Sequence, residues 1–394
     1  MRILVAHNYL RPPSGENTVF EEETAMLESH GHTVERFVLR NEELDQWSLL
    51  RKALIPFRVF WSVSTYRRFA QRIREFRPDV VHFHNVFPLI SPACYHAAKR
   101  AGVPVVQTLH HFRFVCPGAM LFRDGRVCED CRAMRFGPGI WHGCYRGSRL
   151  QTAGIAAAVY LHYLFGTWSR CIDGYIALSS FAQDKFQALG LPARRFFVKP
   201  NFLNIDLRQS GDREAWGVCI GRVGEEKGIR SLVAALRRAS DVQVKIVGDG
   251  PLRGYLTAEL AKEGLENVEY LGMLPRDRCL ELLWRARFLV FPSVWYEGMP
   301  MVVLEAMAGG TPVVASRIGA LPDLVEHEVT GLLVTPGSVE ELSTAMGRLA
   351  ADPERSLAMG ARGQELFRER FTADANHAQL VRIYQQVIDG AREG

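Results

Sequence analysis

The sequence lacks the features that mark several classes of protein. No apolar run approaches the about 20 residues that a membrane-spanning helix requires, and the apolar start of the chain, Ile3–Ala6, is too brief for a signal peptide. There is no internal repeat, no low-complexity segment and no basic stripe with a nucleic-acid-binding motif. We therefore expect a cytoplasmic globular protein that binds no nucleic acid. Its eight cysteines are expected to be reduced or metal-bound and not paired in disulfides.

The length and the distribution of charge indicate two unlike halves. A chain of 394 residues, 47% of them hydrophobic, is long enough for two domains with separate cores. Residues 1–200 hold 26 of the 48 Lys and Arg and 16 of the 43 Asp and Glu, a net charge of +10. Residues 201–394 hold the remainder and carry −5. The basic first half is therefore expected to meet an anionic partner.

Short apolar runs alternate with longer helical patterns along the chain, which is typical of parallel sheets flanked by helices. We expect two doubly wound, Rossmann-like α/β domains at 1–200 and 201–374, and a last helix within 375–394 that packs back on the first domain. Because ligands bind beyond the carboxyl ends of such strands, the two domains are expected to share one cleft. The expected strands are Ile3–Ala6, Thr33–Val38, Val80–His84, Val105–Thr108, Tyr175–Leu178, Phe197–Val198, Ala215–Ile220, Val242–Val247, Val268–Tyr270, Phe288–Phe291, Val313–Ala315 and Gly331–Val334.

The most informative stretch of the chain runs from Phe291 to Val314. After an apolar strand it carries Glu297, a proline-led helix start near Met299 or Pro300, and Glu305 one to two turns into that helix. The N–H groups at a helix start attract phosphate, and carboxylates accept hydrogen bonds from hydroxyl groups. This combination favours a nucleotide sugar as the ligand. The alternative is a pair of acidic residues that only complement the helix dipole.

A second motif follows the apolar strand that ends near Ile220. It reads Gly221-Arg222-x4-Lys227-Gly228 and leads into an expected helix at Ile229–Ala239. An arginine fork and a lysine point charge at a strand end suit a diphosphate that departs with negative charge. The alternative is a solvated loop with routine surface charges, and the expected position of this turn, with Arg222 and Lys227 facing the Glu297 loop, argues against it.

Both motifs resemble those of the family 4 retaining glycosyltransferases. Phe291–Val314 is similar to the family's Glu-x7-Glu motif in spacing and in surrounding residues, and Gly221–Gly228 is similar to its donor-diphosphate clamp. Lys245–Pro251 is a third match. The resemblance covers nearly the full length and implies the GT-B fold, with two Rossmann-like domains that face a central cleft. It also implies catalysis without a cofactor and a nucleotide diphosphate sugar as the donor.

The resemblance assigns roles to residues of the second half. Arg222 and Lys227 would stabilise charge on the leaving diphosphate. Glu297 would orient the sugar and support positive charge at its anomeric carbon, and Glu305 would hold the ribose hydroxyls. Further donor-binding candidates act through main-chain groups: Met273 and Leu274 at the nucleobase, and Gly298, Met299, Met301 and Val302 at the helix start.

Two positions of the first half also follow from the resemblance. Relatives have a double glycine within the segment that corresponds to Pro12–Asn17, and this chain keeps one, Gly15, whose amide would approach the sugar phosphate. The alternative there is an ordinary turn between strand and helix. His110 matches the histidine that the family places beside the donor sugar, with a structural histidine as the alternative. His82 and His84, on the preceding strand, are expected in the core or behind the site.

Four cysteines lie in a loop-rich insertion, residues 112–147, that is poor in periodic apolar residues. Cys128 and Cys131 form a Cys-x-x-Cys pair, which is typical of a zinc knuckle, and Cys116 and Cys144 are candidates for the further ligands. A structural zinc ion would explain how the segment holds a shape. The alternative is four reduced thiols. The other cysteines lie in apolar patterns and are expected in the core: Cys94, Cys171, Cys219 and Cys279.

A basic stretch in the first half is interleaved with aromatic residues. Residues 51–77 hold eight basic residues and one acidic residue, Glu75, and the segment Gly154–Trp168 is apolar as well. Such a pair of segments can lie on an anionic membrane surface, which would make the protein peripheral at the inner face of the plasma membrane. The alternative is helices with solvated charges.

The patterns, together with the resemblance to the family, predict a retaining glycosyltransferase. It would move a sugar from a nucleotide diphosphate sugar to a glycan or lipid-linked acceptor in the synthesis of a bacterial surface polysaccharide. Retention, with the leaving phosphate taking the acceptor proton, follows from the resemblance alone. One alternative is a nucleotide-sugar epimerase or hydrolase on the same fold, although such epimerases lack the Gly-Arg-x4-Lys-Gly clamp. The other is a catalytically silent partner that binds nucleotide or glycan.

Overall fold

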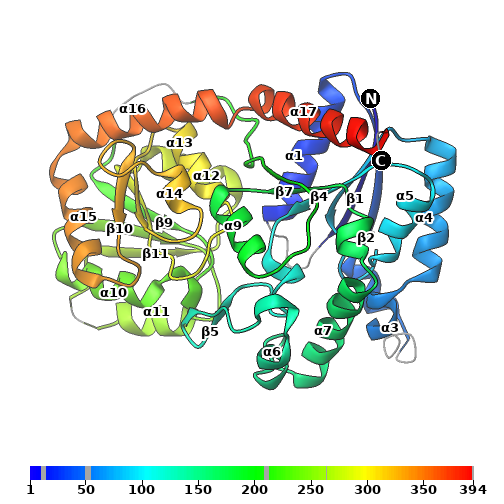
Figure 1. Ribbon diagram of the computed structural model, residues 1–394. Helices are drawn as coiled ribbons and strands as arrows, with labels where there is room; N and C mark the ends of the chain where they lie inside the picture. The colour runs from blue at the N-terminus through cyan, green and yellow to red at the C-terminus, as the bar shows by residue number, and fades with distance from the viewer. Residues whose placement is uncertain (10–14, 49–54, 208–212, 263, 393–394) are drawn as a thin grey trace. The chain divides into compact units, whose positions relative to one another are not determined.

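In the computed structural model the chain forms two compact units (Figure 1). The structure describes residues 1–9, 15–48, 55–207, 213–262 and 264–392. Unit 1 comprises Met1–Leu121, Glu129–Asn201 and Ala373–Gly394. Unit 2 comprises Phe122–Cys128 and Phe202–Thr372. Each unit is therefore assembled from segments that are distant in the sequence.

Unit 1 is built on a six-stranded parallel sheet in the order β2-β1-β3-β4-β7-β8. Strands β3, β4 and β7 are buried along their whole length. Burial on both faces is what a parallel sheet covered by helices requires, and it explains the near-continuous apolar runs in these strands. The strands are β1 (Arg2–Tyr9), β2 (Thr33–Arg40), β3 (Val80–Asn85), β4 (Val105–Leu109), β7 (Gly174–Ala177) and β8 (Phe196–Val198).

The helices of unit 1 bury one face each. In α4, for example, Ser62 caps the first turn by accepting a hydrogen bond from the Thr65 amide, and Phe69 and Ile73 are buried. The last helix, α17, contacts α1 and β4 (Figure 1). The helices are α1 (Gly15–Ser29), α3 (Ile55–Phe60), α4 (Val63–Phe76), α5 (Ala93–Arg100), α6 (Gly137–Trp141), α7 (Arg149–Leu164), α8 (Thr167–Arg170), α9 (Ser180–Ala188) and α17 (Ala373–Arg392).

Unit 2 repeats this architecture with a sheet in the order β11-β10-β9-β12-β13-β14, again parallel throughout. The strands are β9 (Trp216–Ile220), β10 (Gln243–Val247), β11 (Val268–Gly272), β12 (Phe288–Phe291), β13 (Val313–Ser316) and β14 (Gly331–Val334). The helices are α10 (Ile229–Arg238), α11 (Arg253–Leu260), α12 (Arg276–Arg285), α13 (Met301–Ala308), α14 (Leu321–Leu324), α15 (Val339–Ala351) and α16 (Pro353–Arg370).

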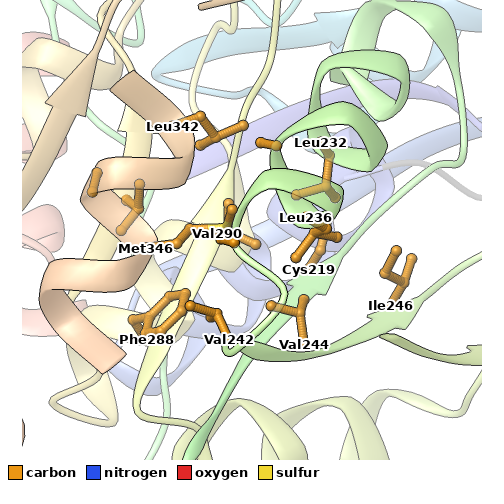
Figure 2. Packing of buried hydrophobic residues seen from close by; sticks show 14 of the residues in the cluster. Cys219, Leu232, Leu236, Val242, Val244, Ile246, Phe288, Val290, Leu342 and Met346 are labelled. Carbon is orange, nitrogen blue, oxygen red and sulfur yellow. The ribbon is translucent and has the colours of Figure 1, made fainter. Parts of the chain in front are cut away.

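One apolar core of unit 2 lies between its sheet and helices α10 and α15. Figure 2 shows Leu232 and Leu236 of α10 and Met346 of α15 beside strand residues such as Val290. These side chains have relative exposures of 0%. Burying one such side chain contributes about 1.5–3 kcal/mol, so this core fixes the positions of the strands whose ends carry the candidate site.

Each sheet has one point at which the strand order reverses. In unit 2 the chain runs from β9 outward to β10 and β11 and then returns to β12 on the other side of β9. In unit 1 the same reversal lies between β1 and β3. Ligands of open parallel sheets bind at such a switch point, beyond the carboxyl ends of the strands. The topology thus singles out the segments that follow β9 and β12 and those that follow β1 and β3.

The structure confirms the prediction of two doubly wound α/β units, and all twelve expected strands are present. The insertion at 112–147 was expected to be loop-rich, and it also contains a hairpin of β5 (Phe122–Arg123) and β6 (Arg126–Val127) that the sequence did not predict. Two-residue strands are too short to show a periodic pattern. In the part of the chain that the structure describes, no helix is both long and apolar enough to cross a membrane.

Candidate active site

The switch point of unit 2 holds an ion pair between Lys227 and Glu297. The two atoms that approach most closely, Lys227 Nζ and Glu297 Oε1, are 2.7 Å apart. Lys227 lies in a short turn after β9, and Glu297 follows β12, the neighbour of β9 in the sheet. Glu297 is buried, with a relative exposure of 4%. The pattern that placed these two residues on facing loops thus brings their charges into direct contact.

Glu297 Oε1 also accepts hydrogen bonds from side chains of its own loop. Ser293 Oγ donates one, and Trp295 Nε1 donates another at 2.6 Å. The Lys227 ammonium lies 5.3 Å from the Trp295 ring centroid and 5.0 Å from that of Phe291, within the range of cation–π attraction. Because several groups hold one carboxylate oxygen, the loop is ordered before any ligand binds.

Two glycines allow other segments to approach this loop. A Cβ on Gly228 would lie 2.0 Å from the Pro292 carbonyl oxygen, so the turn that carries Lys227 can pack against the end of β12 only with glycine there. A Cβ on Gly319 would lie 2.5 Å from the Glu297 amide nitrogen. The Ala320 amide next to it donates to the Glu297 carbonyl at 2.9 Å. The segment after β13 therefore supports the backbone of Glu297.

Arg222 pairs with a different residue from Lys227. Its Nη1 lies 3.6 Å from Glu226 Oε1, and its side chain is 58% exposed. The sequence suggested that both cations face the Glu297 loop, and the structure brings Lys227 alone of the two into contact with Glu297. An exposed side chain at the end of β9 is nevertheless available to a ligand at the switch point.

Glu305 lies in α13, which begins at Met301, one to two residues later than the sequence indicated. Arg276 of α12 holds its carboxylate, with both Nε and Nη2 at 3.3 Å from Oε1. Burial raises the pKa of Glu305, and Arg276 offsets part of that rise. The Trp284 indole donates to the Glu305 carbonyl at 2.9 Å, which ties α12 to α13.

The remaining donor-binding candidates of unit 2 lie in two segments, residues 273–274 and residues 298–302. Met273 is 71% exposed and, with Leu274, lies between β11 and α12. The Leu274 carbonyl accepts a hydrogen bond from the Cys279 thiol at 3.6 Å. Met299 is buried, and the other candidates at the helix start are half-buried: Gly298, Met301 and Val302.

The switch point of unit 1 presents buried polar groups. Gly15 is the first residue of α1 and is exposed, whereas the neighbouring Glu16 is buried. Residues 12–14 of the predicted glycine segment lie outside the described residues. Glu16 Oε1 accepts a hydrogen bond from Asn85 Nδ2 at 3.0 Å, and Asn85 ends β3. Burial raises the pKa of Glu16 to about 7.

His110 follows β4. It belongs to a series of hydrogen-bonded side chains that determines which of its ring nitrogens carries the proton. His84 Nε2 lies 3.1 Å from Glu23 Oε1, and His84 Nδ1 lies 2.9 Å from His110 Nε2. Because the carboxylate accepts, Nε2 of His84 carries a proton and its Nδ1 accepts one from His110 Nε2. Burial, together with His84 and His7, holds the pKa of His110 well below its usual range. His110 is therefore neutral, with Nδ1 left as an acceptor.

Glu23 lies at the far end of this series of side chains, and Lys199 neutralises its negative charge. Ligand atoms of Glu23, His82 and His84 lie within 4.8 Å of one another, a grouping that could hold a metal ion. However, Lys199 Nζ lies 2.9 Å from Glu23 Oε2, and both side chains are 1% exposed. Burial raises the pKa of Glu23, but Lys199 and the two histidines together hold it well below its usual range. The cation of this group is an ammonium, and the cluster is an ion-pair network. His82 and His84 are buried, as predicted.

The structure also locates the predicted cysteines. Cys116 and Cys144 flank Gly118, and Cys131 lies against Gly139. Cys128 follows the β5–β6 hairpin. The core prediction is correct for three of the other cysteines, but Cys279 is only half-buried. The three buried cysteines are Cys94, Cys171 and Cys219.

Sequence reasoning missed several residues of these sites. Glu16 and Glu23 lie seven residues apart on the buried face of α1, and carboxylates on an otherwise apolar helix face were a usable signal. Gly319 could not be found in this way, because only the fold shows that it touches Glu297. The other missed residues are Ser293, Trp295 and Arg276.

Comparison with known proteins identifies the family. The family model "Glycosyltransferase Family 4" matches residues 13–207, and the model "Glycosyl transferases group 1" matches residues 215–352. A 2-deoxystreptamine glucosyltransferase of Streptomyces kanamyceticus is 33% identical over 86% of this chain and 85% of its own. The chain belongs to the family 4 glycosyltransferases.

Other relatives match over shorter stretches. An alpha-maltose-1-phosphate synthase of Mycolicibacterium smegmatis is 36% identical over 43% of this chain and 47% of its own. An amylovoran biosynthesis glycosyltransferase of Erwinia amylovora is 30% identical over 44% and 47%. The chain thus spans about half the length of these two relatives.

Solved structures support the glycosyltransferase fold. The sucrose-phosphate synthase of Thermosynechococcus elongatus has a TM-score of 0.70 at 19% identity over 99% of both chains. The Anabaena protein HepE, solved in complex with UDP-glucose, has a TM-score of 0.66 at 21% identity over the full length of both chains. At these identities the likeness shows the fold alone, and it confirms the predicted GT-B architecture.

Proposed function

We propose that this protein transfers a sugar from a nucleotide diphosphate sugar to an acceptor, and that unit 2 binds the donor at its switch point. The observation that carries this proposal is the contact of Lys227 with the buried carboxylate of Glu297, between the loops after β9 and β12. A diphosphate needs cations, a sugar needs hydroxyl acceptors, and this pair supplies both at the position where open parallel sheets bind ligands.

The roles of the donor site follow from its chemistry. Lys227 and the exposed Arg222 neutralise the departing diphosphate, which removes the need for a divalent cation at that point. Glu297 accepts hydrogen bonds from the sugar hydroxyls through Oε2, because Oε1 already accepts from Lys227, Ser293 and Trp295. Glu305, with its pKa raised by burial, accepts from the ribose hydroxyls.

Two finer features of the reaction rest on the family. Retention of the anomeric configuration, with the leaving phosphate taking the acceptor proton, is proposed because both motifs of unit 2 resemble those of the retaining family. HepE was solved with UDP and with UDP-glucose, which supports a uridine nucleotide as the first donor to examine. The resemblance also gives His110 a role at the donor sugar, and its neutral ring with Nδ1 as an acceptor suits a hydrogen bond from a hydroxyl group.

A lipid-linked acceptor is supported by an exposed apolar surface on unit 1. Helix α3 packs against α7, and the relative exposures are 72% for Phe57 of α3, 57% for Leu164 of α7 and 60% for Phe165. Arg67 and Arg74 of α4, which follows α3 in the chain, are exposed, and residues 1–200 carry +10 overall. Exposed apolar side chains in a basic domain suit an anionic bilayer. We therefore propose a peripheral location at the inner face of a bacterial plasma membrane and a role in surface-polysaccharide synthesis.

The first test of the proposed function measures the binding of nucleotide sugars. A bound donor raises the thermal midpoint by mass action, so a thermal-shift panel of UDP-, GDP-, ADP- and dTDP-sugars identifies the donor. Release of the nucleoside diphosphate is then measured with and without a bacterial lipid extract that contains lipid-diphosphate-linked glycans. Release that requires the extract supports transfer. Equal release without it indicates a hydrolase, and no release from any nucleotide sugar contradicts the proposal.

A further inference from the structure

Helix α12 of unit 2 begins with an arginine at a position where the helix dipole disfavours a cation. Arg276 is the first residue of α12 and directly follows Pro275. The N-terminus of a helix carries a partial positive charge, so acidic residues are favoured in the first turn and basic residues in the last. The contacts that the Arg276 guanidinium makes outside its own helix are therefore informative.

The guanidinium of Arg276 contacts the carboxylate of Glu305 in α13. Both Nε and Nη2 of Arg276 lie 3.3 Å from Glu305 Oε1. Among the described residues, no other side chain pairs with this carboxylate, and none donates to Oε2. The Glu305 side chain is 14% exposed. One oxygen of a nearly buried carboxylate is thus held by the protein, and the other is left as an acceptor for a ligand.

The two helices that carry this pair are fixed relative to each other. Helix α12 packs against α13 (Figure 1), and Trp284 Nε1 of α12 donates to the Glu305 carbonyl at 2.9 Å. A Cβ on Gly309 would lie 2.0 Å from the Trp284 ring, so the indole can pack at the end of α13 only with glycine there. Because both helices are fixed, the Arg276 contact sets the direction of the Glu305 carboxylate.

Arg276 also favours the charged form of Glu305. Burial raises the pKa of the Glu305 carboxyl group, and the charge and hydrogen bond of Arg276 offset part of that rise. The other titratable group that faces Glu305 is the Cys279 thiol of α12, whose pKa is raised by burial and by Glu305 itself. This thiol is therefore neutral and supplies no positive charge. Without the guanidinium, the surroundings of Glu305 would favour the uncharged acid.

A charged carboxylate in a fixed direction can distinguish ribose from deoxyribose. Ribose offers hydroxyl donors at C2′ and C3′, whereas a 2′-deoxyribose lacks the first. A site built to accept a hydroxyl hydrogen bond rejects the analogue that lacks this hydroxyl, because its buried acceptor is then left unpaired. The loss is larger for a charged acceptor than for a neutral one. The discrimination therefore depends on the charge and the direction of Glu305.

We propose that Arg276 is a positioning residue of the donor site, which holds Glu305 Oε2 toward the ribose and thereby sets a preference for ribonucleotides over 2′-deoxyribonucleotides. This inference rests on the proposed function, in which Glu305 accepts from the ribose hydroxyls. Arg276 acts through Glu305 and touches neither the sugar that is transferred nor the diphosphate.

The test compares the affinities of the full-length protein for UDP and 2′-deoxy-UDP by calorimetric titration, or for the matching pair of the base that the thermal-shift panel identifies. The wild type is expected to bind UDP about tenfold or more tightly, as for a hydrogen bond to a charged group. Arg276→Ala is expected to bring this ratio toward one, and Arg276→Lys to recover part of it. Arg278→Ala is the matched control, since Arg278 is an exposed residue of the same helix that pairs with Glu281, and it should keep the wild-type ratio.

A double-mutant cycle separates positioning from direct contact with the nucleotide. Arg276→Ala in the Glu305→Gln background is expected to cause no further loss of UDP affinity, because the neutral amide needs no cation beside it. A further loss in that background, or an equal loss of UDP and 2′-deoxy-UDP affinity in Arg276→Ala alone, would overturn the proposal and leave the donor site itself standing. Wild-type protein that binds no nucleoside diphosphate would contradict the proposed function and this inference with it.

Discussion

Lys227 Nζ and Glu297 Oε1 lie 2.7 Å apart, and the contact joins the loops that follow two adjacent strands of unit 2. A diphosphate that reaches this point offers Lys227 a second anionic partner. In the proposed reaction the ammonium then neutralises the leaving group while Ser293 and Trp295 still hold Glu297. The ion pair thus keeps both side chains in position before the donor arrives, which is the preorganisation that electrostatic catalysis requires.

The two carboxylates of the donor site are expected to respond differently to neutralisation. Glu297→Gln should keep the affinity for UDP but lose sugar transfer, because its carboxylate acts on the sugar. Glu305→Gln should weaken UDP binding, because it removes a charged acceptor for the ribose, and a hydrogen bond to a charged group contributes about 1.5–3 kcal/mol. Calorimetric titration with UDP and a transfer assay separate the two effects. Equal effects of both variants on affinity and on rate would mean that the roles are wrongly assigned.

Gly319 is expected to be essential for the geometry of Glu297. It has a φ of +60°, and an added Cβ would lie 2.5 Å from the Glu297 amide nitrogen. Gly319→Ala should therefore displace the loop and lower the transfer rate. Gly337→Ala is the matched control, since Gly337 has a φ of +77° and no atom within 4 Å of its added Cβ. Both variants should lose about 1 kcal/mol or more of stability from the positive φ, measured by urea unfolding. Equal transfer rates in the two variants would show that Gly319 does not support the site.

Glu16 should make the protein less stable as the pH rises through its titration range. Burial raises its pKa to about 7 from the ordinary 4.5, so between these values the folded state holds a proton that the unfolded state has lost. Stability therefore falls as the pH rises from about 4.5 to 7, and the loss stays constant above that range. The other groups that face it are Asn85, Arg113 and His111, whose own pKa is lowered by burial to about 3.

Glu16→Gln isolates this effect. A shift of this size corresponds to about 3 kcal/mol, so the variant should be more stable than the wild type at pH 8 by up to that amount and similar to it at pH 4.5. Urea unfolding at both pH values measures the difference. A stability difference between the two proteins that does not change with pH would exclude Glu16 as the titrating group.

The apolar surface of α3 and α7 should bind anionic vesicles. Binding of the wild type to vesicles of phosphatidylglycerol and phosphatidylcholine should weaken as salt rises, because the Debye length falls to about 8 Å at physiological ionic strength. Phe57→Ser combined with Leu164→Ser should reduce binding at every salt concentration. Neutralising Arg67, Arg68, Arg72 and Arg74 together should remove the salt dependence and spare UDP binding, which we propose for unit 2.

The control for this surface is Leu357→Ser, which alters an exposed apolar side chain of α16 in unit 2. Vesicle sedimentation should give the same binding for this variant as for the wild type. If the wild type does not bind anionic vesicles even at low salt, a soluble acceptor becomes the better hypothesis.

The sequence predicted the parallel sheets and the pairing of the Glu297 loop with the Lys227 turn. It did so because the apolar strands are distinct and because strand ends at a switch point must lie together. It could not predict that Arg222 pairs with Glu226 while Lys227 pairs with Glu297, since both cations are on one turn. The choice between them depends on side-chain directions that only the folded turn defines.

The sequence also could not predict the network of buried polar side chains in unit 1. Glu23, His84 and Lys199 come from α1, β3 and the segment after β8, and only the packed sheet brings polar atoms of His84 and Lys199 within 3.1 Å of the Glu23 carboxylate. The Gly319 contact with Glu297 has the same origin, because it depends on the path of the chain after β13. Long-range contacts of single side chains follow from tertiary packing, which periodicity does not encode.

The most direct test of the account is the transfer rate of Lys227→Ala with the donor that the thermal-shift panel identifies. Loss of one preorganised charge partner should cost about 2–4 kcal/mol of transition-state stabilisation, a decrease in rate of about 30- to 1,000-fold. Lys245→Ala, which removes a lysine paired with Glu269 on the neighbouring strands of the same sheet, should transfer sugar at the wild-type rate. A folded Lys227→Ala protein with near-normal turnover would contradict the assignment of the donor site to the Lys227–Glu297 switch point.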